Sequence, residues 1–459
     1  MVDQVDVVVV GMGVGGEEVG GRLAEAGLSV VGIEDRLVGG ECPYWGCVPS
    51  KMMIRAANLL AETRRVDGMA GRAEVMPDWA PVARRIREEA TDSWDDTVAV
   101  QRFEGKGGRF VRGRGRFAGP MRVAVGDREF AAERALVIAI GTSPTAPPIP
   151  GLAGTPYWTN REAIEAERLP QSLAVLGGGA IGLELAQVYA RFGVSVTVVE
   201  VASRLLAVEE PESSRTAARA LAADGVTLHT GAKVESVAHS DAGFQLTLAG
   251  AEPVTAERLL VATGRRPELS GLGLDSLGPD LVRTARDGSA IEVDDRMRAG
   301  EGVWAVGDVT GHGAFTHVAM YQAGIAVRDI LGQAGPPADY RALPRVTFTD
   351  PEIGAVGLTE GQARERGLAV QIGIAQVPST ARGWIHKAGN DGFIKLIVDR
   401  DRGVLVGATS AGPNGGEVLS ALAVAIHGEV PVDRLRHMIY AYPTFHRGIE
   451  DALRHLAPA

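Results

Sequence analysis

The sequence predicts an α/β protein with two doubly wound parallel sheets, followed by a C-terminal domain of α+β type. Two observations predict the parallel sheets. An apolar strand, a glycine-rich turn, a helix and a second strand follow one another at the N-terminus, and the same order recurs from residue 173. Apolar strand runs that alternate with helical runs from about residue 345 indicate the third domain. At roughly 150 residues per domain, the 459 residues have room for three domains.

The first strand–helix–strand segment starts the chain. Val5–Val10 is a continuous β-branched run, which is typical of a parallel strand buried on both faces. A helical stretch and a second apolar run, Leu28–Ile33, follow, and this run ends at Glu34. The turn after the first strand has the spacing GxGxxG, with its glycines at Gly11, Gly13 and Gly16. This order predicts one βαβ unit of a doubly wound sheet.

The second segment repeats the pattern. The apolar run Leu173–Leu176 leads into a glycine-rich turn, a helical stretch follows, and the next run, Ser195–Val199, ends at Glu200. The same glycine spacing is present, at Gly177, Gly179 and Gly182. We therefore predict a second doubly wound, Rossmann-like sheet.

The two glycine patterns predict two bound dinucleotides. The first glycine permits a tight turn, the second lets the backbone approach a pyrophosphate, and the third lets the helix pack on the strand. The helix N-terminus presents unpaired N–H groups to the pyrophosphate. Glu34 and Glu200 lie where a carboxylate can accept a hydrogen bond from a ribose 2′-hydroxyl. The pair is most simply a flavin and a nicotinamide nucleotide, and the alternative is two turns without a ligand.

The type of nicotinamide nucleotide depends on two charged residues that follow the second turn. Glu200 would repel a 2′-phosphate, which favours NAD(H) over NADP(H). Arg204, a little further along, could instead attract that phosphate. The sequence therefore prefers NAD(H) and leaves NADP(H) open.

Further strand runs complete the predicted domains. Ala135–Ile140 runs into Gly141, and Leu259–Ala262 is followed by Gly264, so that each run closes one of the two sheets. The C-terminal domain is predicted to contain strands at 346–348, 393–398 and 404–408, and helices at 417–427 and 432–439.

Composition and charge exclude several classes of protein. With 47 basic and 57 acidic residues the formal net charge is −10, which argues against a general binder of nucleic acid or of an anionic membrane. No apolar run is long enough for a signal peptide or a membrane span, so we expect a cytoplasmic protein. A basic cluster is spaced as a solvated strand face, with arginines at Arg109, Arg112, Arg114 and Arg116.

The chain has only two cysteines, which excludes a disulfide scaffold and a four-thiolate zinc site. Both lie in the segment GGECPYWGCVPSK, at Cys42 and Cys47, before a helix expected to start near Pro49. A cysteine just before a helix N-terminus has a stabilised thiolate. Cys47 is therefore suited to carry negative charge and Cys42 to be the exposed attacking thiol. The alternative is an inert buried pair.

The cysteine segment resembles the GGxCxxxxGCxPSK motif of the class I pyridine nucleotide–disulfide oxidoreductases. This family includes dihydrolipoamide dehydrogenase, glutathione reductase and mercuric reductase. The resemblance covers nearly the whole chain, including both glycine patterns, the strand ends at 140–142 and 262–264, and the segment FTDPE at 348–352. It implies an FAD-binding domain at 1–148 and 273–342, an NAD(P)-binding domain at 149–272, and a C-terminal dimerisation domain at 343–459.

The resemblance also implies how the cofactors are held. The first glycine pattern, with Glu34 and Gly141, would bind FAD, and the second, with Glu200 and Gly264, would bind NAD(P)H. Asp308 resembles the aspartate that binds the ribityl chain of the flavin.

The resemblance further implies the path of the electrons. They would pass from NAD(P)H to FAD and then to a Cys42–Cys47 disulfide, whose reduced Cys42 would attack a small-molecule substrate. Lys51 resembles the lysine beside the reactive flavin nitrogen, and Glu184 resembles its ion-pair partner. The chain would form a homodimer in which each C-terminal domain completes the neighbour's active site.

The chain departs from the family pattern near its C-terminus. Disulfide reductases of this family carry a His-Pro pair there with a glutamate five residues after the histidine, whereas this chain has Tyr442 and Arg447 at these two positions. A phenol with a pKa of about 10 is a poor proton shuttle at neutral pH, and losing such a group costs about 10²–10⁴-fold in rate. We therefore expect a non-standard disulfide or thiol substrate. A helical turn from Pro443 could bring His446 beside Tyr442, and the alternative is an ordinary surface histidine.

Two tyrosines are candidates for lining the substrate site. Mercuric reductase also has a tyrosine near the position of Tyr442, and it shares the segment Pro-Tyr-Trp-Thr, which contains Tyr157 here. This chain has no C-terminal cysteine pair to deliver a metal ion. Reduction of mercuric or other metal ions, or of quinones, is therefore an alternative function. Another is a dihydrolipoamide dehydrogenase-like subunit that docks to a larger complex.

Overall fold

The computed structural model describes residues 2–277 and 282–456. Contacts within the chain divide it into two compact units of three segments each. The first unit comprises Met1–Ser50, Arg84–Thr145 and Gly264–Asp339, and the second comprises Lys51–Ala83, Ala146–Thr263 and Tyr340–Ala459. Each unit holds one of the two glycine patterns. The three predicted domains divide the chain more finely, and their boundaries stay a prediction.

The first unit is built on an eight-stranded sheet with strand order β16-β17-β6-β1-β2-β3, which the β4–β5 hairpin joins at β6. Along β1, Val7 and Val9 face one hydrophobic core, and Val8 and Val10 face the core on the other side. This confirms the predicted parallel strand with two buried faces. The strands are β1 (Val2–Val10), β2 (Val30–Glu34), β3 (Arg109–Arg112), β4 (Arg116–Gly119), β5 (Arg122–Val125), β6 (Arg128–Ile138), β16 (Arg298–Gly300) and β17 (Val303–Ala305).

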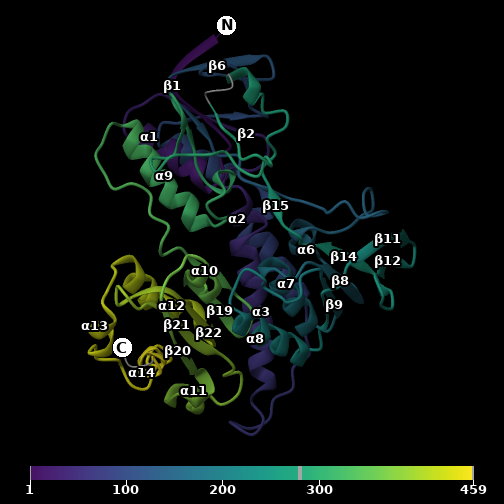
Figure 1. Cartoon of the computed structure of the whole chain (residues 1–459). Coiled ribbons are helices and arrows are strands. Elements are labelled where there is room, and N and C mark those ends of the chain that lie inside the picture. The colour runs from purple at the N-terminus through teal and green to yellow at the C-terminus, as the bar shows by residue number, and fades with distance from the viewer. Residues whose placement is uncertain (1, 278–281, 457–459) are drawn as a thin grey trace. The chain divides into compact units, whose positions relative to one another are not determined.

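Two helices, α1 (Val14–Glu25) and α9 (Thr316–Ile330), lie side by side in the first unit (Figure 1). Their apolar stripes pack on the same core as alternate valines of β1, which fixes both helices to one face of the sheet. The other helical segments here are α2 (Glu41–Tyr44), α5 (Thr97–Gly105), the π-helical turn η1 (Ile86–Ala90) and the 3-10 turns η2 (Asp92–Trp94), η3 (Leu274–Leu277) and η4 (Asp308–Thr310).

The second unit contains a four-stranded parallel sheet with the order β10-β9-β8-β14. Its central strands are apolar and buried, which confirms the second predicted βαβ unit. The strands are β8 (Ser172–Leu176), β9 (Ser195–Glu200), β10 (Thr227–Thr230) and β14 (Arg258–Val261), and a smaller sheet holds β11 (Val234–Ser240), β12 (Gly243–Leu248) and β13 (Val254–Ala256). The helices are α6 (Asn160–Glu165), α7 (Ala180–Arg191) and α8 (Pro211–Ala223).

The C-terminal part of the second unit is the predicted α+β region. A five-stranded antiparallel sheet has the order β18-β19-β22-β21-β20, and α12 packs on it. The strands are β18 (Pro344–Thr347), β19 (Glu352–Gly357), β20 (Val370–Gln376), β21 (Phe393–Asp399) and β22 (Val404–Gly412). The helices are α10 (Glu360–Glu365), α11 (Ala381–His386), α12 (Gly415–His427), α13 (Val432–Arg436) and α14 (Gly448–Arg454), with the 3-10 turn η5 (Val377–Ser379).

Buried ion pairs join the parallel and antiparallel sheets of the second unit. The ammonium of Lys395, on β21, is buried and lies 2.8 Å from Glu210, 3.2 Å from Glu212 and 2.9 Å from Glu360. A buried cation of this kind needs carboxylate partners because desolvation of an unpaired charge is costly. The cluster therefore fixes α8 and α10 to the antiparallel sheet.

Three further elements connect these regions. The long helix α3 (Cys47–Arg64) begins in the first unit and continues in the second, and α4 (Ala80–Arg85) returns the chain to the first. A two-stranded antiparallel ribbon pairs β7 (Ser143–Pro144) with β15 (Arg265–Arg266). The strand ends at 140–142 and 262–264 look alike in the sequence, and the residues that directly follow them are thus hydrogen-bonded to each other.

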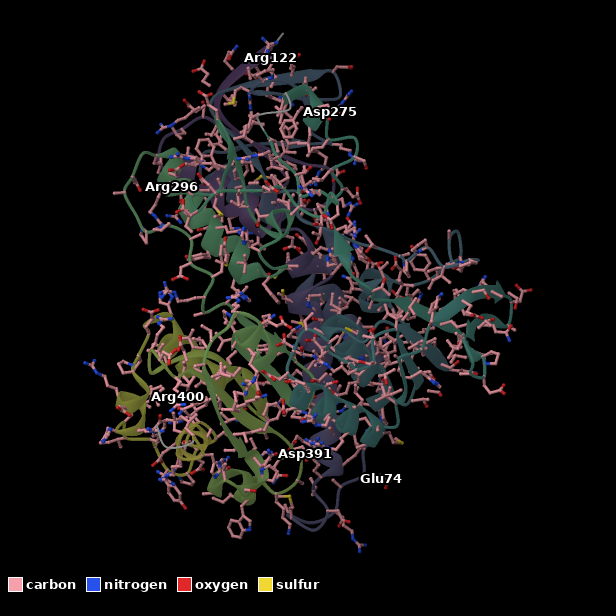
Figure 2. The ribbon with its side chains drawn as sticks, in the orientation of Figure 1. Glu74, Arg122, Asp275, Arg296, Asp391 and Arg400 are labelled. Atoms are coloured by element: carbon pink, nitrogen blue, oxygen red, sulfur yellow. The ribbon has the colours of Figure 1, made fainter. Side chains whose placement is uncertain are left out.

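Charged side chains are spread over the surface. In Figure 2 the labelled side chains include both signs, and all of them are exposed: Glu74, Arg122, Asp275, Arg296, Asp391 and Arg400. The four arginines between 109 and 116 are also exposed, but they do not share one strand face, because Arg109 and Arg112 lie on β3, Arg114 on the following loop and Arg116 on β4. Within the described residues, every helix is too short or too polar to cross a membrane.

Candidate active site

The first glycine pattern forms a tight turn between β1 and α1. Gly11 has φ +91°, and a Cβ there would collide with the carbonyl group of Ala139. A Cβ on Gly16 would collide with the carbonyl oxygen of Gly11, so the helix can approach the strand only without one. At Gly13 the nearest atom to a Cβ is the Cα of Gly40, at 3.8 Å. This distribution of space fits the roles expected for a dinucleotide turn.

Glu34 is held against this turn. Its Oε2 accepts a hydrogen bond from the Met12 amide at 2.8 Å, and its Oε1 accepts one from the Arg36 amide at 2.9 Å. Burial raises the pKa of its carboxyl group. The carboxylate thus stands at the end of β2, where a ribose hydroxyl is expected to bind.

The second glycine pattern repeats this geometry. A Cβ on Gly177, which has φ +114°, would collide with the carbonyl oxygen of Ala262, and one on Gly182 would collide with the carbonyl oxygen of Gly177. At Gly179 a Cβ would have no neighbour within 4 Å, so the backbone there is open to a ligand. This turn also fits a dinucleotide.

Two charged side chains after the second turn are held by backbone groups. Glu200 accepts hydrogen bonds from the amides of Gly178 at 2.5 Å and Ala202 at 2.6 Å. Arg204 donates to the carbonyl oxygens of Leu206 at 3.1 Å and Ala207 at 2.6 Å. The guanidinium of Arg204 is therefore hydrogen-bonded to backbone carbonyl groups of its own loop.

Asp308 lies in η4 and is held by the ribbon that joins the two strand ends. Thr142 donates its hydroxyl to the Asp308 carboxylate at 2.8 Å, and Arg265 donates to the Thr142 hydroxyl at 3.0 Å and to its carbonyl oxygen at 2.7 Å. Burial raises the pKa of Asp308. Gly141 and Gly264 flank this group with φ +62° and +135°. A partly buried carboxyl group between two such turns suits hydroxyl groups of a bound flavin.

The cysteine segment folds into two consecutive helices. Cys42 lies in α2, and Cys47 is the first residue of α3, so the helix begins earlier than Pro49. The two thiols are hydrogen-bonded to each other, and this bond together with burial raises the pKa of Cys42. Gly46 makes the close turn between them possible, since a Cβ there would lie 3.0 Å from the Glu41 carbonyl oxygen.

One expectation about the thiols is wrong. Cys42 is half-buried, whereas Cys47 is exposed. The reason is local, because Cys42 is enclosed within the short helix α2, while Cys47 stands at the open first turn of α3.

Sequence reasoning missed Thr316. Its hydroxyl oxygen lies 3.3 Å from the Sγ of Cys47, although 269 positions separate the two residues. Thr316 begins α9, a helix that the sequence patterns did not predict. No sequence motif marks this residue, so only the tertiary structure places its hydroxyl at the thiols.

Lys51 and Glu184 form an ion pair in the second unit. The Lys51 Nζ lies 2.8 Å from Oε2 of Glu184, whose side chain is buried. The other oxygen of Glu184 accepts a hydrogen bond from the Phe348 amide at 2.8 Å, and the Lys51 ammonium lies 4.5 Å from the centre of the Phe348 ring. The start of FTDPE thus holds both partners.

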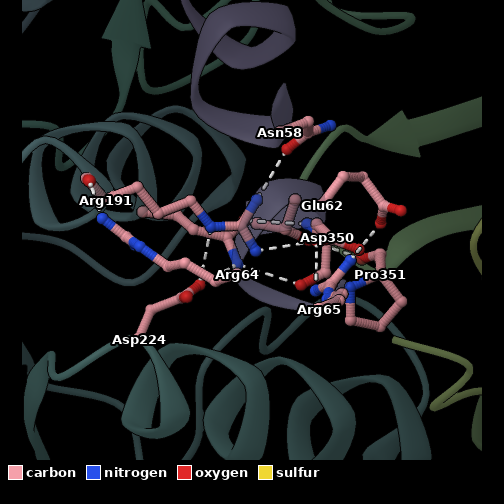
Figure 3. Close-up of polar contacts among 10 residues, drawn as sticks. Asn58, Glu62, Arg64, Arg65, Arg191, Asp224, Asp350 and Pro351 are labelled. Atoms are coloured by element: carbon pink, nitrogen blue, oxygen red, sulfur yellow. Dashed lines mark hydrogen bonds and ion pairs between the residues drawn. The ribbon is translucent and has the colours of Figure 1, made fainter. Parts of the chain in front are cut away.

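A buried network continues from this pair along α7 (Figure 3). Arg191 is only 1% exposed, and it donates to Asn58 of α3 at 2.6 Å, to Asp224 at 2.9 Å and to Asp350 at 2.8 Å. Arg65, directly after α3, also pairs with Asp350, at 2.6 Å. The network therefore fixes α3, α7 and the segment before β19 to one another.

The C-terminal segment differs from the expected arrangement. Residues 443–446 form a turn rather than a helix, and α14 begins only at Gly448. The His446 ring centre lies 6.0 Å from that of Tyr440, while the guanidinium of Arg447 lies over the ring of Tyr442 at 5.2 Å. The expected helical turn that would bring His446 beside Tyr442 is therefore absent from this described segment.

The two candidate tyrosines lie in different surroundings. Tyr442 is 68% exposed. Tyr157 is partly buried and packs on the core formed by β8, β9 and the small sheet of the second unit. A cavity of about 500 Å³ is lined by Arg382, Glu417 and His446, among others, and Tyr442 is not one of its lining residues. Within residues 2–277 and 282–456, histidine, cysteine, aspartate and glutamate side chains form no group of three or more that could hold a metal ion.

Two family models match the chain. The model of the pyridine nucleotide-disulphide oxidoreductases matches residues 5–323, and the model of their dimerisation domain matches residues 343–453. The matched ranges include both glycine patterns, the cysteine segment and the C-terminal sheet. They agree with the predicted fold class of two nucleotide-binding regions followed by a dimerisation region.

Curated relatives align over nearly the full chain. A mercuric reductase of Streptomyces lividans is 36% identical over 455 residues, covering 96% of this chain and 93% of the relative. A dihydrolipoyl dehydrogenase of Chlorobaculum tepidum is 34% identical over 463 residues, covering 98% and 96%.

Solved structures show the same fold. The copper(II) complex of RclA, an HOCl-induced flavoprotein disulfide reductase of Escherichia coli, superimposes with a TM-score of 0.86 at 27% identity, covering 98% of this chain and 99% of that one. LpdA of Mycobacterium tuberculosis has a TM-score of 0.84 at 27% identity, with 99% of each chain covered.

Proposed function

Because the chain belongs to the pyridine nucleotide–disulfide oxidoreductases, flavoenzymes that use FAD and NAD(P)H, we propose that it oxidises NADH through Cys42 and Cys47. The observation that carries this proposal is the hydrogen-bonded thiol pair at the start of α3. One helical turn later on α3 stands Lys51, which is paired with Glu184. A thiol pair, with Cys42 on α2 and Cys47 on α3, and a lysine paired with a carboxylate are the parts that the reaction of this family needs.

The proposed binding sites follow the two glycine patterns. FAD, when bound, supplies the two-electron carrier between the nicotinamide and the thiol pair. The residues that would hold FAD are Gly11, Gly13, Gly16, Glu34, Gly141 and Asp308, and those that would hold the nicotinamide nucleotide are Gly177, Gly179, Gly182, Glu200 and Gly264.

The thiol chemistry balances in two steps. One hydride equivalent breaks the Cys42–Cys47 S–S bond, and the two electrons and one proton leave one thiol and one thiolate. The raised pKa of Cys42 favours the proton on Cys42 and the negative charge on Cys47. Once Cys42 has lost its proton, its sulfur attacks one sulfur of the disulfide acceptor, whose S–S bond breaks and releases a first thiol that takes up the proton. Cys47 then attacks the sulfur of Cys42, which releases the second half of the acceptor as a thiolate and forms the Cys42–Cys47 disulfide again.

The substrate we propose is a disulfide outside the standard low-molecular-weight group, or the corresponding thiol in the reverse direction. Tyr442 occupies the position of the histidine base and is exposed, and Arg447 rather than a glutamate lies over its ring. An acceptor whose leaving group is already acidic would need no such base. We further propose a homodimer in the cytosol, with the dimerisation region at 343–453 forming the interface.

The preference for NADH rests on the loop after β9. Glu200 is fixed by two amides close to the turn, where its charge would repel a 2′-phosphate. Arg204, which could attract that phosphate, donates to the carbonyl oxygens of its own loop instead. Both contacts favour NAD(H).

An anaerobic titration with NADH tests the proposed function. The wild-type chain should develop a long-wavelength charge-transfer absorption between the Cys47 thiolate and the flavin, and Cys47→Ser should lack it. A wild type without this band would contradict the proposed thiol mechanism.

A metal ion is the second candidate acceptor. A relative at 36% identity is named a mercuric reductase, RclA was solved as a copper(II) complex, and Tyr442 stands where a proton shuttle is missing. Metal-ion reduction needs electrons but no protonated leaving group. Oxidation of NADH that depends on mercuric or copper(II) ions and falls in Tyr442→Phe would favour this acceptor, whereas the same rate with and without the ions would exclude it.

A further inference from the structure

Two buried carboxylates end the loop that follows β9. The loop comprises residues 201–210 and lies between β9 and α8. Glu209 and Glu210 are its last two residues and are 7% and 1% exposed. Adjacent carboxylates are rarely buried unless cations pair with them, because removing an unpaired charge from water is costly. The cations that pair with them therefore decide where the loop ends.

Both carboxylates are paired with the antiparallel sheet of the second unit. The guanidinium of Arg345, on β18, donates to the two oxygens of Glu209 at 2.8 and 2.9 Å, in the forked geometry that suits a carboxylate best. The ammonium of Lys395, on β21, donates to Glu210 at 2.8 Å, and the other oxygen of Glu210 accepts from the Glu360 amide at 2.6 Å. The end of the loop is thus fixed by residues at least 136 positions away in the sequence.

Two more carboxylates surround the Lys395 ammonium, at 3.2 Å for Glu212 and 2.9 Å for Glu360. Each of these also has an arginine partner. Arg215 lies 3.2 Å from Glu212, and Arg364 lies 2.8 Å from Glu360. The positive charge of Lys395 is therefore the one that compensates the buried carboxylate at the end of the loop.

Hydrogen bonds connect the end of the loop to the second glycine pattern. The Glu209 amide donates to the Leu206 carbonyl oxygen at 2.9 Å, and the Leu206 amide donates to the Gly178 carbonyl oxygen at 2.9 Å. The Gly178 amide in turn donates to the Glu200 carboxylate at 2.5 Å. Gly178 lies between the first two glycines of the pattern, so the loop holds the backbone at the point where a pyrophosphate is expected.

The loop needs this support because its backbone is strained and its end is charged. Leu206 is buried and has φ +47°, a left-handed conformation that persists only where the surroundings hold it. Unpaired charges on Glu209 and Glu210 would also repel the diphosphate of a nucleotide at the glycine turn. The two cations from the antiparallel sheet oppose both effects.

We propose that Arg345 and Lys395 are positioning residues for the nicotinamide nucleotide, because they pair with Glu209 and Glu210 and so hold the loop after β9 against the second glycine pattern. This inference rests on the proposed nucleotide site. It adds two residues of the region that matches the dimerisation domain. Both act through the carboxylates of the loop, so they set the affinity for the nucleotide and leave the rate of hydride transfer unchanged.

Anaerobic reduction of the FAD-loaded chain by NADH, followed by stopped-flow absorbance of the flavin, separates affinity from rate. The dependence on NADH concentration gives an apparent Kd and a limiting rate. Titration with ADP-ribose, the part of the nucleotide that cannot donate a hydride, gives a second Kd. The variants are Arg345→Met, Glu209→Gln and the two combined. Arg402→Met is the matched control, since Arg402 belongs to an exposed ion pair with Glu429 in the same region.

Coupling from residues that do not touch a ligand changes its affinity by roughly two- to thirtyfold. We therefore expect both Kd values to rise by about that factor in Arg345→Met, with a limiting rate within about twofold of the wild type. The double variant should show no further loss than the weaker-binding single variant, because both substitutions break the same pair. Lys395→Met should also raise both Kd values. If Arg345→Met fails to bind FAD, Arg345→Lys and Glu209→Gln make the same comparison.

The outcomes distinguish the inference from the proposed function. ADP-ribose that binds the wild type and Arg345→Met with the same Kd would overturn the positioning role and leave the nucleotide site intact. An equal rise of Kd in Arg402→Met would also overturn it, since the effect would then be a general weakening of the region. A wild type that binds no ADP-ribose would overturn the nucleotide site itself, and the positioning role with it.

Discussion

The cysteine segment of the first unit and the C-terminal segment of the second unit follow the family pattern to different degrees. The segment 39–51 carries the whole motif, and its thiols lie beside each other at the start of a long helix. The segment 440–447 has a tyrosine and an arginine in place of the histidine and glutamate, and it forms a turn. The residues that we propose for electron transfer thus follow the family pattern, whereas the position of the family's acid–base histidine does not.

The largest expected effect tests the cysteine segment, which carries the whole family motif. Cys47→Ser and Cys42→Ser should each lower NADH-dependent reduction of any disulfide acceptor by more than about 10³-fold, because no S–S bond can form. Steady-state rates with NADH measure this, and bound FAD, read from the visible spectrum, serves as the control. Turnover of a disulfide acceptor above one tenth of the wild-type rate in either variant would show that electrons bypass the pair.

The next largest effect concerns the polar network around Arg191, which holds α3 and α7 together. Arg191→Met removes a buried guanidinium from the partly buried carboxylates of Asp224 and Asp350, of which Asp350 keeps its pair with Arg65, so we expect a loss of about 3 kcal/mol in unfolding free energy. Denaturant melts measure it. The exposed pair of Arg85 and Glu89 gives the control, since Arg85→Met should cost only about 0.3–0.5 kcal/mol. Equal losses in the two variants would contradict the structural role of the network.

The C-terminal segment can be tested by restoring the histidine and glutamate of the family pattern at positions 442 and 447. Tyr442→His combined with Arg447→Glu should raise the turnover of dihydrolipoamide or a glutathione-type disulfide by about 10²-fold, since a positioned acid–base group contributes that much. Arg447→Glu alone should give no such gain. If the double variant shows no gain with any standard disulfide, the lost histidine is not what restricts the substrate.

The smallest expected effect concerns the nucleotide. Glu200→Ala should lower the preference for NADH over NADPH by about tenfold, because it removes the charge that repels a 2′-phosphate. Arg204→Ala should change the preference little, since its guanidinium donates to Leu206 and Ala207. The ratio of kcat/KM for the two nucleotides measures both. A larger change of the nucleotide preference in Arg204→Ala than in Glu200→Ala would show that Arg204, rather than Glu200, sets this preference.

The sequence predicted the fold where local patterns decide it. The valines of β1 could be recognised because a continuous apolar run suits a strand buried on both faces, and this run faces two cores in the structure. The glycine turns could be recognised because a Cβ at Gly11 or Gly177 collides with a neighbouring strand. The pairing of Lys51 with Glu184 was expected only from the resemblance.

Features that depend on distant segments were beyond the sequence. Thr316 contacts Cys47 although 269 positions separate the two residues. Strand β7 pairs with β15 although residues 145–264 lie between them in the sequence. The turn at 443–446 differs from the expected helix, and the aromatic ring next to His446 is that of Tyr440. Tertiary packing decides each of these, and a single sequence does not record it.

The central claim is that electrons from NADH reach the Cys42–Cys47 pair. The most direct measurement adds one equivalent of NADH to the oxidised, FAD-loaded chain without oxygen, followed by alkylation and mass spectrometry of the peptide that carries both cysteines. The account predicts that both cysteines become alkylated while the flavin keeps most of its oxidised absorption. A bleached flavin together with a cysteine pair that stays unalkylated would contradict it.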